Sequence, residues 1–431
     1  MTTKPKQPAA SEGLTAAPEA GHRGLFSSFS ERQFRWLFTS NTTFFLGLGG
    51  QQILRSWLVF QLTGSATSLG LISTAVALPM LLIAPAGGVV ADRVDRRTLV
   101  AAGQLAVIVS ELSILVLMIA GHIRFWHLLV SAFVLGTVFS FIMPARQALV
   151  ANAVGRSRLT NAMALNMAAI NTTRIVGPAA AGLLIGLTGL QIAWGLNVAC
   201  FILALAFLKG VEAAPAEQID QQTSLMGNLM EGVAYLRGDR LVLVLLFFGV
   251  IPMFLIMPFQ NLLVLFAEDV WHVGATGLGT LGAVAGTGGL VGAVLVAWRS
   301  NTARRLRVML SAVFGFGVFL IGFALSPWYL LALPLLFLGN IFANLYGTLN
   351  NTAIQVLIPD HVRGRVSSFL MMSFSLPLLG TLPVSAFAQA VGAPLAISLA
   401  AFMAVLIAFA FYLFSRPLRS LDERMENALK G

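Results

Sequence analysis

Long apolar stretches recur along the whole chain, and they constrain its fold more than any other feature. A membrane-spanning helix needs about 20 mainly apolar residues, and twelve stretches of this sequence meet that requirement. Charged residues make up only 10% of the 431 positions, whereas about 25% is usual in soluble domains. The sequence therefore predicts an all-helical protein that crosses a membrane many times.

The predicted spans fall into two sets of six, separated by one long polar segment. The first set lies at 36–61, 67–91, 98–120, 126–149, 160–188 and 190–209. The second set lies at 240–266, 276–298, 307–326, 328–357, 364–390 and 393–415. We therefore expect an N-terminal tail at 1–35, a first bundle at 36–210, a linker at 211–239 with an amphipathic helix over 225–237, a second bundle at 240–415 and a C-terminal tail at 416–431.

Basic residues are distributed unevenly among the predicted loops. Lys and Arg gather in the two tails and in the loops after even-numbered spans, and Arg124 is the one basic residue in the other loops. By the positive-inside rule, both termini are predicted to be cytoplasmic, in a multi-pass protein of the inner (cytoplasmic) membrane. This bias explains the net charge of +10 without a nucleic-acid partner.

Several kinds of chemistry have no visible site in the sequence. The one cysteine, Cys200, lies in an apolar stretch, so an intrachain disulfide and a cysteine-based metal cluster are excluded. The sequence contains neither a Gly-x-x-x-x-Gly-Lys-Ser/Thr phosphate loop nor a Gly-x-Ser-x-Gly nucleophile motif. We therefore expect no metal, no cofactor, no ATP-driven transport and no enzyme activity.

An internal repeat relates the two halves of the chain. The segment QALVANAV at 147–154 recurs as QVLIPDHV at 355–362, at an offset of 208 residues. Two arginines follow each copy, and in the second copy Asp360, Arg363 and Arg365 mark a cytoplasmic loop. Such a duplication predicts a transporter whose site lies between its two halves.

The second span ends in a dense cluster of charges, GGVVADRVDRR at 87–97. Anchoring at the cytoplasmic surface explains the arginines but not Asp92, which lies one helical turn after Gly88. The cluster resembles the loop signature of the major facilitator superfamily, Gly-x-x-x-Asp-Arg-x-Gly-Arg-Arg, with Asp95 at the usual glycine. The resemblance implies a cytoplasmic conformational latch formed by Gly88, Asp92, Arg93, Arg96 and Arg97. The matching segment at 296–307 keeps only basic residues, so the latch is expected to be asymmetric.

Four longer segments resemble the branch of this superfamily that includes the enterobactin exporter and macrolide efflux proteins. They are WLVFQLTGSATSLGL at 57–71, PARQALVANAV at 144–154, NAMALNMAAINTTRIVGPAAAGLL at 161–184 and IPDHVRGRVSSF at 358–369. The resemblance implies two pseudo-symmetric six-helix halves in a monomer. It also implies export of a small amphipathic molecule, such as a siderophore or drug, by alternating access with proton antiport. A facilitator, an uptake carrier and a non-transporting descendant of a transporter remain alternatives.

A further motif lies in the fifth predicted span. Gly177, Pro178 and Gly182 are similar to the Gly-Pro-x-x-Gly-Gly signature of antiporters in this superfamily. Proline removes a backbone donor and bends a helix, while glycines allow a neighbouring helix to approach closely. We expect a gate between this span and the glycine-rich span at 276–298, although an incidental kink is the alternative.

Charged residues inside the spans are candidates for proton coupling, because such residues are costly in a membrane and usually functional. Glu111 is the acid that lies well inside an apolar span, and we expect it to carry protons with Arg55 or Arg174 as its partner. A static ion pair is an equally good interpretation. Arg146 lies near a span end, where its side chain could extend to the membrane surface.

Polar and aromatic residues within the spans are candidates for lining a substrate cavity. They either form hydrogen bonds between helices or face a cavity suited to an amphipathic solute. The candidates are Asn41, Gln52, Asn171, Phe254, Gln260, Asn340, Asn344 and Tyr346.

Overall fold

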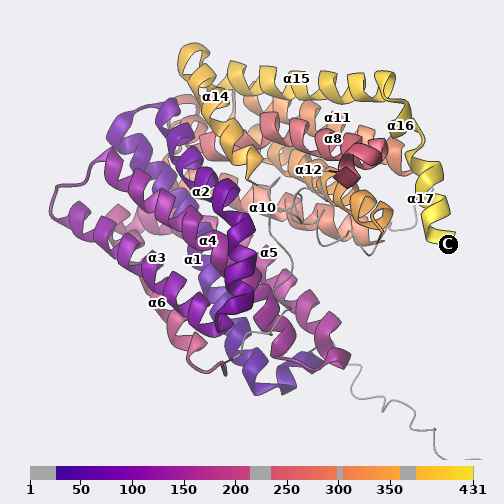
Figure 1. The fold of residues 1–431 in the computed structure, drawn as a ribbon. Coiled ribbons are helices and arrows are strands. Elements are labelled where there is room, and N and C mark those ends of the chain that lie inside the picture. The colour runs from indigo at the N-terminus through magenta and orange to yellow at the C-terminus, as the bar shows by residue number, and fades with distance from the viewer. Residues whose placement is uncertain (1–25, 214–233, 299–303, 360–374, 431) are drawn as a thin grey trace, which may run out of the picture.

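The computed structural model describes residues 26–213, 234–298, 304–359 and 375–430 (Figure 1). In these residues the chain is helical almost throughout and forms no β-strand. The amphipathic helix predicted at 225–237 lies largely outside the described residues, as do Asp360, Arg363 and Arg365. The all-helical prediction is thus confirmed for the part of the chain that the structure describes.

The helices lie where the sequence predicted spans, and their ends differ from the predictions by at most a few residues, except at 364–390. The first half contains α1 (Arg32–Thr63), α2 (Ala66–Arg93), α3 (Arg96–Ile119), α4 (Phe125–Asn152), α5 (Leu159–Thr188) and α6 (Leu190–Leu208), with short turns η1 (Ser27–Ser30) and η2 (Arg156–Arg158). Gly64 ends α1 in the left-handed conformation, at φ 56°, where a side chain would be strained.

The second half of the chain begins with an irregular span. A continuous apolar run is made of α8 (Arg240–Ile256), η3 (Met257–Leu262), α9 (Leu263–Leu265) and η4 (Phe266–Val270). The helices that follow are α10 (Gly274–Trp298), α11 (Arg305–Ala324), α12 (Tyr329–Leu357), α14 (Leu376–Val391), α15 (Ala393–Phe414), α16 (Arg416–Arg419) and α17 (Leu421–Lys430). The first part of the span predicted at 364–390 lies outside the described residues.

Among the described residues, ten helical segments are long and apolar enough to cross a membrane. Helix α1 is not one of them, because polar residues such as Asn41, Gln52 and Arg55 lower its hydropathy. The described part of α14 is apolar but only 16 residues long. The protein is therefore a multi-pass membrane protein.

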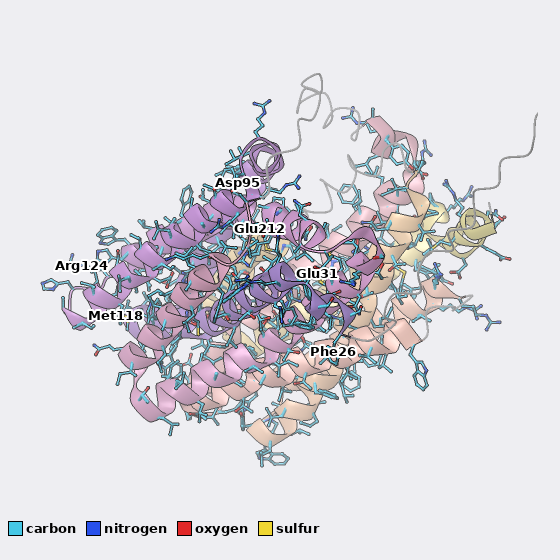
Figure 2. All side chains as sticks on the ribbon, turned by 90° about the horizontal axis from the view of Figure 1, so that it is seen from below. Phe26, Glu31, Asp95, Met118, Arg124 and Glu212 are labelled. Carbon is cyan, nitrogen blue, oxygen red and sulfur yellow. The ribbon has the colours of Figure 1, made fainter. Side chains whose placement is uncertain are left out.

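The helices form two groups, which Figure 1 shows in indigo to magenta and in rose to yellow. Helices α1 to α6 pack on one another, and so do α8 to α15, while α5 packs extensively on α10 and α2 on α14 across the groups. We call the end that carries η1, α16 and α17 the terminal face, and the other end the opposite face. Figure 2 shows this polarity in the first group, with Glu31, Asp95 and Glu212 at one end and Met118 and Arg124 at the other.

Contacts between the groups lie toward the opposite face. Gln389 near the end of α14 accepts hydrogen bonds from the backbone N–H of Ala66 at 2.6 Å and from the Ser65 hydroxyl at 3.0 Å, at the start of α2. Near the end of α5, a Cβ at Gly186 would lie 2.3 Å from the Thr276 hydroxyl of α10. In Figure 1 the two groups diverge from these contacts toward the terminal face.

The segment expected to be a C-terminal tail is helical and packs on the second group. Leu418, Leu421 and Met425 are buried there. Arg424 forms an ion pair with Asp239 at the start of α8, at 3.0 Å. These contacts hold α16 and α17 against the terminal ends of the second group.

Candidate functional site

A buried ion pair lies inside the first helical group. Arg55 of α1 donates a hydrogen bond from Nη2 to Glu111 Oε1 of α3 at 2.7 Å. The hydroxyl of Ser131 on α4 donates to the same oxygen at 2.8 Å, and it accepts from Arg55 at 3.1 Å. Because all three residues are at most 5% exposed, the charges neutralise each other in a region of low dielectric.

The Glu111 carboxylate is only half satisfied. Its second oxygen, Oε2, has no hydrogen-bond partner among the described residues, and neither does Nε of Arg55. Trp194 of α6 donates to the backbone carbonyl of Glu111 at 3.3 Å and so fixes this turn of α3. The geometry leaves one carboxylate oxygen without a hydrogen-bond partner in the described part of the chain, while the other holds the arginine.

Of the two partners that the sequence offered for Glu111, the structure selects Arg55. Arg174 is exposed and lies in the middle of α5. Its side chain forms no ion pair or hydrogen bond with the described part of the chain. Arg174 therefore has a different environment from the Glu111 pair.

A second buried arginine lies nearer the terminal face. Arg146 of α4 is 2% exposed and packs its guanidinium over the Phe44 ring, 4.2 Å from the ring centre. It donates to the Asn41 side-chain oxygen, and Asn41 donates to the Asn166 side chain of α5 at 3.0 Å. Arg146 does not extend to the membrane surface, as its place near a span end would have allowed, because Asn41 and Phe44 hold its guanidinium inside the group.

The gate motif of α5 lies against α10 with almost no space between the two backbones. A Cβ at Gly182 would lie 2.5 Å from Cα of Gly279, and one at Gly282 would lie 2.7 Å from the Pro178 ring. Gly177 instead faces α1, where a Cβ would lie 2.9 Å from the backbone N of Gly50. The motif thus joins α5 to α10 on one side and to α1 on the other.

On its terminal side, the same face of α5 carries residues that are exposed or half-buried. Arg174, Asn171 and Met167 continue the stripe of Pro178 and Gly182 at helical spacing. Arg174 is exposed, Asn171 is half-buried and Met167 is 43% exposed. The close contact therefore covers the opposite half of the stripe and ends near Arg174.

A family model described as "transmembrane secretion effector" matches residues 23–430. The chain belongs to this family of major facilitator superfamily transporters. It is 28% identical to the multidrug efflux pump Tap of Mycolicibacterium fortuitum over 380 residues, which cover 85% of this chain and 91% of that protein. It is 25% identical to macrolide efflux protein A of Streptococcus pyogenes over 359 residues, covering 79% and 86% of the two chains.

A siderophore exporter and a solved structure are also similar to this transporter. The enterobactin exporter EntS of Escherichia coli is 24% identical over 346 residues, covering 78% of this chain and 80% of that protein. The crystal structure of the nucleoside transporter NupG superposes with a TM-score of 0.72 at 13% identity, covering 89% of this chain and 99% of that one. The chain is thus a membrane transporter rather than an enzyme, as the sequence predicted.

The cavity candidates of the transporter divide into two groups by burial. Asn41, Asn340 and Tyr346 are buried within their own helical groups. Asn340 donates to the Leu336 carbonyl of its own helix at 2.8 Å, and Tyr346 donates to the Phe248 carbonyl. The candidates that are partly or fully exposed are Gln52, Asn171, Phe254, Gln260 and Asn344.

The charge cluster after α2 is described only in part. The surroundings of Gly88 and the side chain of Asp92 are not among the described parts of the structure. Asp95, which replaces the usual glycine, caps α3 by accepting from the Thr98 backbone N–H at 2.8 Å and from its hydroxyl at 2.6 Å. Arg97 donates to the Lys209 carbonyl at 3.1 Å, and so connects the cluster to the end of α6.

The rest of the cluster differs in exposure. Arg93 is exposed at the end of α2, and Arg96 is 7% exposed at the start of α3. In the described residues no group of three or more His, Cys, Asp or Glu side chains is placed to hold a metal ion.

Sequence reasoning missed the polar group around Arg146. Asn166 was not among the candidates, although it lies five residues before the candidate Asn171. The sequence signal that could have indicated this group is that Asn41 and Phe44 lie on the same face of α1 as Arg55. Only the packing of α4 and α5 against that face shows what these residues contact.

Proposed function

We propose that the protein is a secondary active exporter of small amphipathic organic molecules, of siderophore or drug type. It works by alternating access, as a monomer in the cell membrane, with both termini cytoplasmic. Twelve spans form two pseudo-symmetric six-helix halves, and the substrate binds between them. The family and its efflux-type relatives support export, while the direction of transport rests on the proposed orientation.

The observation that carries this proposal is the asymmetry of the α5 stripe. Gly182 packs against Gly279 near the opposite face, whereas Met167 is exposed nearer the terminal face. Two helices in such backbone contact exclude a solute, whereas an exposed stripe lets one enter. This state is the one in which an exporter takes up its substrate from the cytoplasm.

Protons are the proposed driving ion, and Glu111 is the proposed carrier. Protonation at Oε2 would neutralise the carboxylate and weaken its attraction for Arg55. Arg55 lies on α1, which also packs against the gate motif through Gly50 and Gly177. A change in the ion pair can therefore act on the gate through α1.

Transport in proteoliposomes tests this proposal. Wild type, Glu111→Gln and the control Glu268→Gln are compared with a fluorescent amphipathic dye and an imposed proton gradient. We expect uphill dye movement in wild type and the control, and only downhill movement in Glu111→Gln. Downhill movement by all three proteins would identify a facilitator and leave the Glu111 pair a structural role.

The latch is a separate part of the proposal. We assign it to Asp92 with Gly88, Arg93, Arg96 and Arg97, at the cytoplasmic end of α2. The contact from Arg97 to the Lys209 carbonyl supports a connection between this end and α6. The second-half loop residues Asp360, Arg363 and Arg365 stay candidates from the sequence repeat alone.

A further inference from the structure

We propose that Arg174 binds an anionic group of the transported molecule, namely a carboxylate or an ionised phenol. This inference rests on the proposed transport function and adds to it a class of substrate. It gives Arg174 a role in substrate binding that is separate from the Glu111 pair.

The position of Arg174 along α5 is the first argument. It lies 15 residues after Leu159 and 14 before Thr188, which places it about 20 Å from either helix end at 1.5 Å per residue. Arginines that extend to the membrane surface lie near helix ends, and a charge at mid-membrane faces protein or a water-filled cavity. Because Arg174 is exposed, we infer that it faces such a cavity.

Contacts of its backbone show which cavity this is. A Cβ at Gly286 of α10 would lie 2.8 Å from the Arg174 carbonyl and 3.0 Å from the Ile175 side chain. Pro178 and Gly182 then extend the contact toward the opposite face. Arg174 thus lies where α5 and α10 separate, at the inner end of the proposed space between the two groups.

Charge is the third argument. Arg174 has no ionic partner among the described residues, and Glu111 is already paired with Arg55. Other acids of the described spans lie near helix ends, as Glu268 and Asp269 do in η4. The space therefore presents a positive charge that favours anions and repels organic cations.

Neighbouring side chains fit an amphipathic anion. Asn171 and Met167 follow Arg174 toward the terminal face on the same stripe. Asn171 adds hydrogen-bonding groups, and Met167 adds an adaptable apolar surface. A guanidinium binds a carboxylate through two parallel hydrogen bonds, which lysine does not reproduce.

Equilibrium binding to the purified protein tests the proposal without requiring transport or a proton gradient. The probes are a dansyl-labelled aromatic carboxylate and its methyl ester, which share one skeleton and differ in charge. Wild type should bind the carboxylate about tenfold or more tightly than the ester, the ratio that 1.4 kcal/mol of preference gives. Arg174→Gln should bind both probes equally, and Arg174→Lys should show an intermediate preference.

Two controls separate a local effect from unfolding. Arg307→Gln removes an exposed arginine at the terminal end of α11 and should keep the full preference for the carboxylate. Arg174→Gln should keep the affinity of wild type for the ester and its unfolding temperature. Equal binding of the two probes by wild type, or an unchanged preference in Arg174→Gln, would overturn the proposal. If wild type prefers the carboxylate but shows no uphill dye movement driven by the proton gradient, the result would contradict only the proposed export mechanism.

Discussion

At the scale of single residues, burial assigns different roles to the three arginines of the first group. Arg55 is paired with Glu111, Arg146 is held by Asn41 and Phe44, and Arg174 is exposed without a partner among the described residues. A sequence pattern cannot separate these cases, because each arginine lies within a mainly apolar span. Their partners come from other helices, so only packing distinguishes them.

The Arg55–Glu111 pair leads to a prediction about stability. Arg55→Met leaves the Glu111 carboxylate buried without its cation, and losing one partner of such a pair costs about 3–5 kcal/mol. We expect a clearly lower unfolding temperature in detergent for Arg55→Met. The double variant Arg55→Met/Glu111→Met should recover most of the loss, because it leaves no unpaired charge. Additive losses in the double variant would show that the two residues do not interact.

At the scale of helical elements, α5 and α10 form one of the two close contacts between the groups, and α2 and α14 form the other. Glycines on both helices bring the backbones together at Gly182 and Gly279. The sequence predicted this pairing from the gate motif and the glycine-rich span. It could not predict that the contact stops near Arg174, because the stopping point depends on how the two groups are inclined.

Adding volume to this contact should separate the two helices. Gly182→Val introduces side-chain atoms where even a Cβ would lie 2.5 Å from the Gly279 backbone, and such overpacking typically costs about 1–3 kcal/mol. We expect spin labels at Thr188 and Thr280 to lie farther apart in this variant than in wild type. Gly195→Val is the matched control, because a Cβ there would meet only Leu115 at 3.7 Å. An unchanged label distance in a folded Gly182→Val protein would contradict a gate at this contact.

At the scale of the whole molecule, one half of the α5 stripe is packed and the other half is exposed. This arrangement predicts that a membrane-impermeant reagent reaches the stripe from one side of the membrane only. In a Cys200→Ala background, Met167→Cys should react with a membrane-impermeant maleimide in inside-out vesicles and not in right-side-out cells. Ala285→Cys, at a position 8% exposed on α10, should react in neither preparation. Labelling of Met167→Cys from outside the cell would reverse the proposed orientation.

The sequence by itself determined the elements of this protein and its family. Each span has to satisfy its backbone hydrogen bonds within the membrane, so a long apolar stretch specifies a helix at that place in the chain. Local signals such as the left-handed turn at Gly64 then set helix ends. The role of Asp95 was not recognised in the sequence. There it is a departure from the loop signature of the superfamily, whereas in the structure it caps α3.

Only the tertiary structure decided what the polar residues contact. Asn41, Asn340 and Tyr346 were cavity candidates by residue type, yet they are buried within their own groups. Glu111 had two possible partners in the sequence, and the packing of α1 against α3 and α4 selected Arg55. The physical reason is that hydropathy places a helix in the membrane without fixing its rotation about its own axis. That rotation is set by contacts with neighbouring helices, and it decides which side chains face the space between the groups.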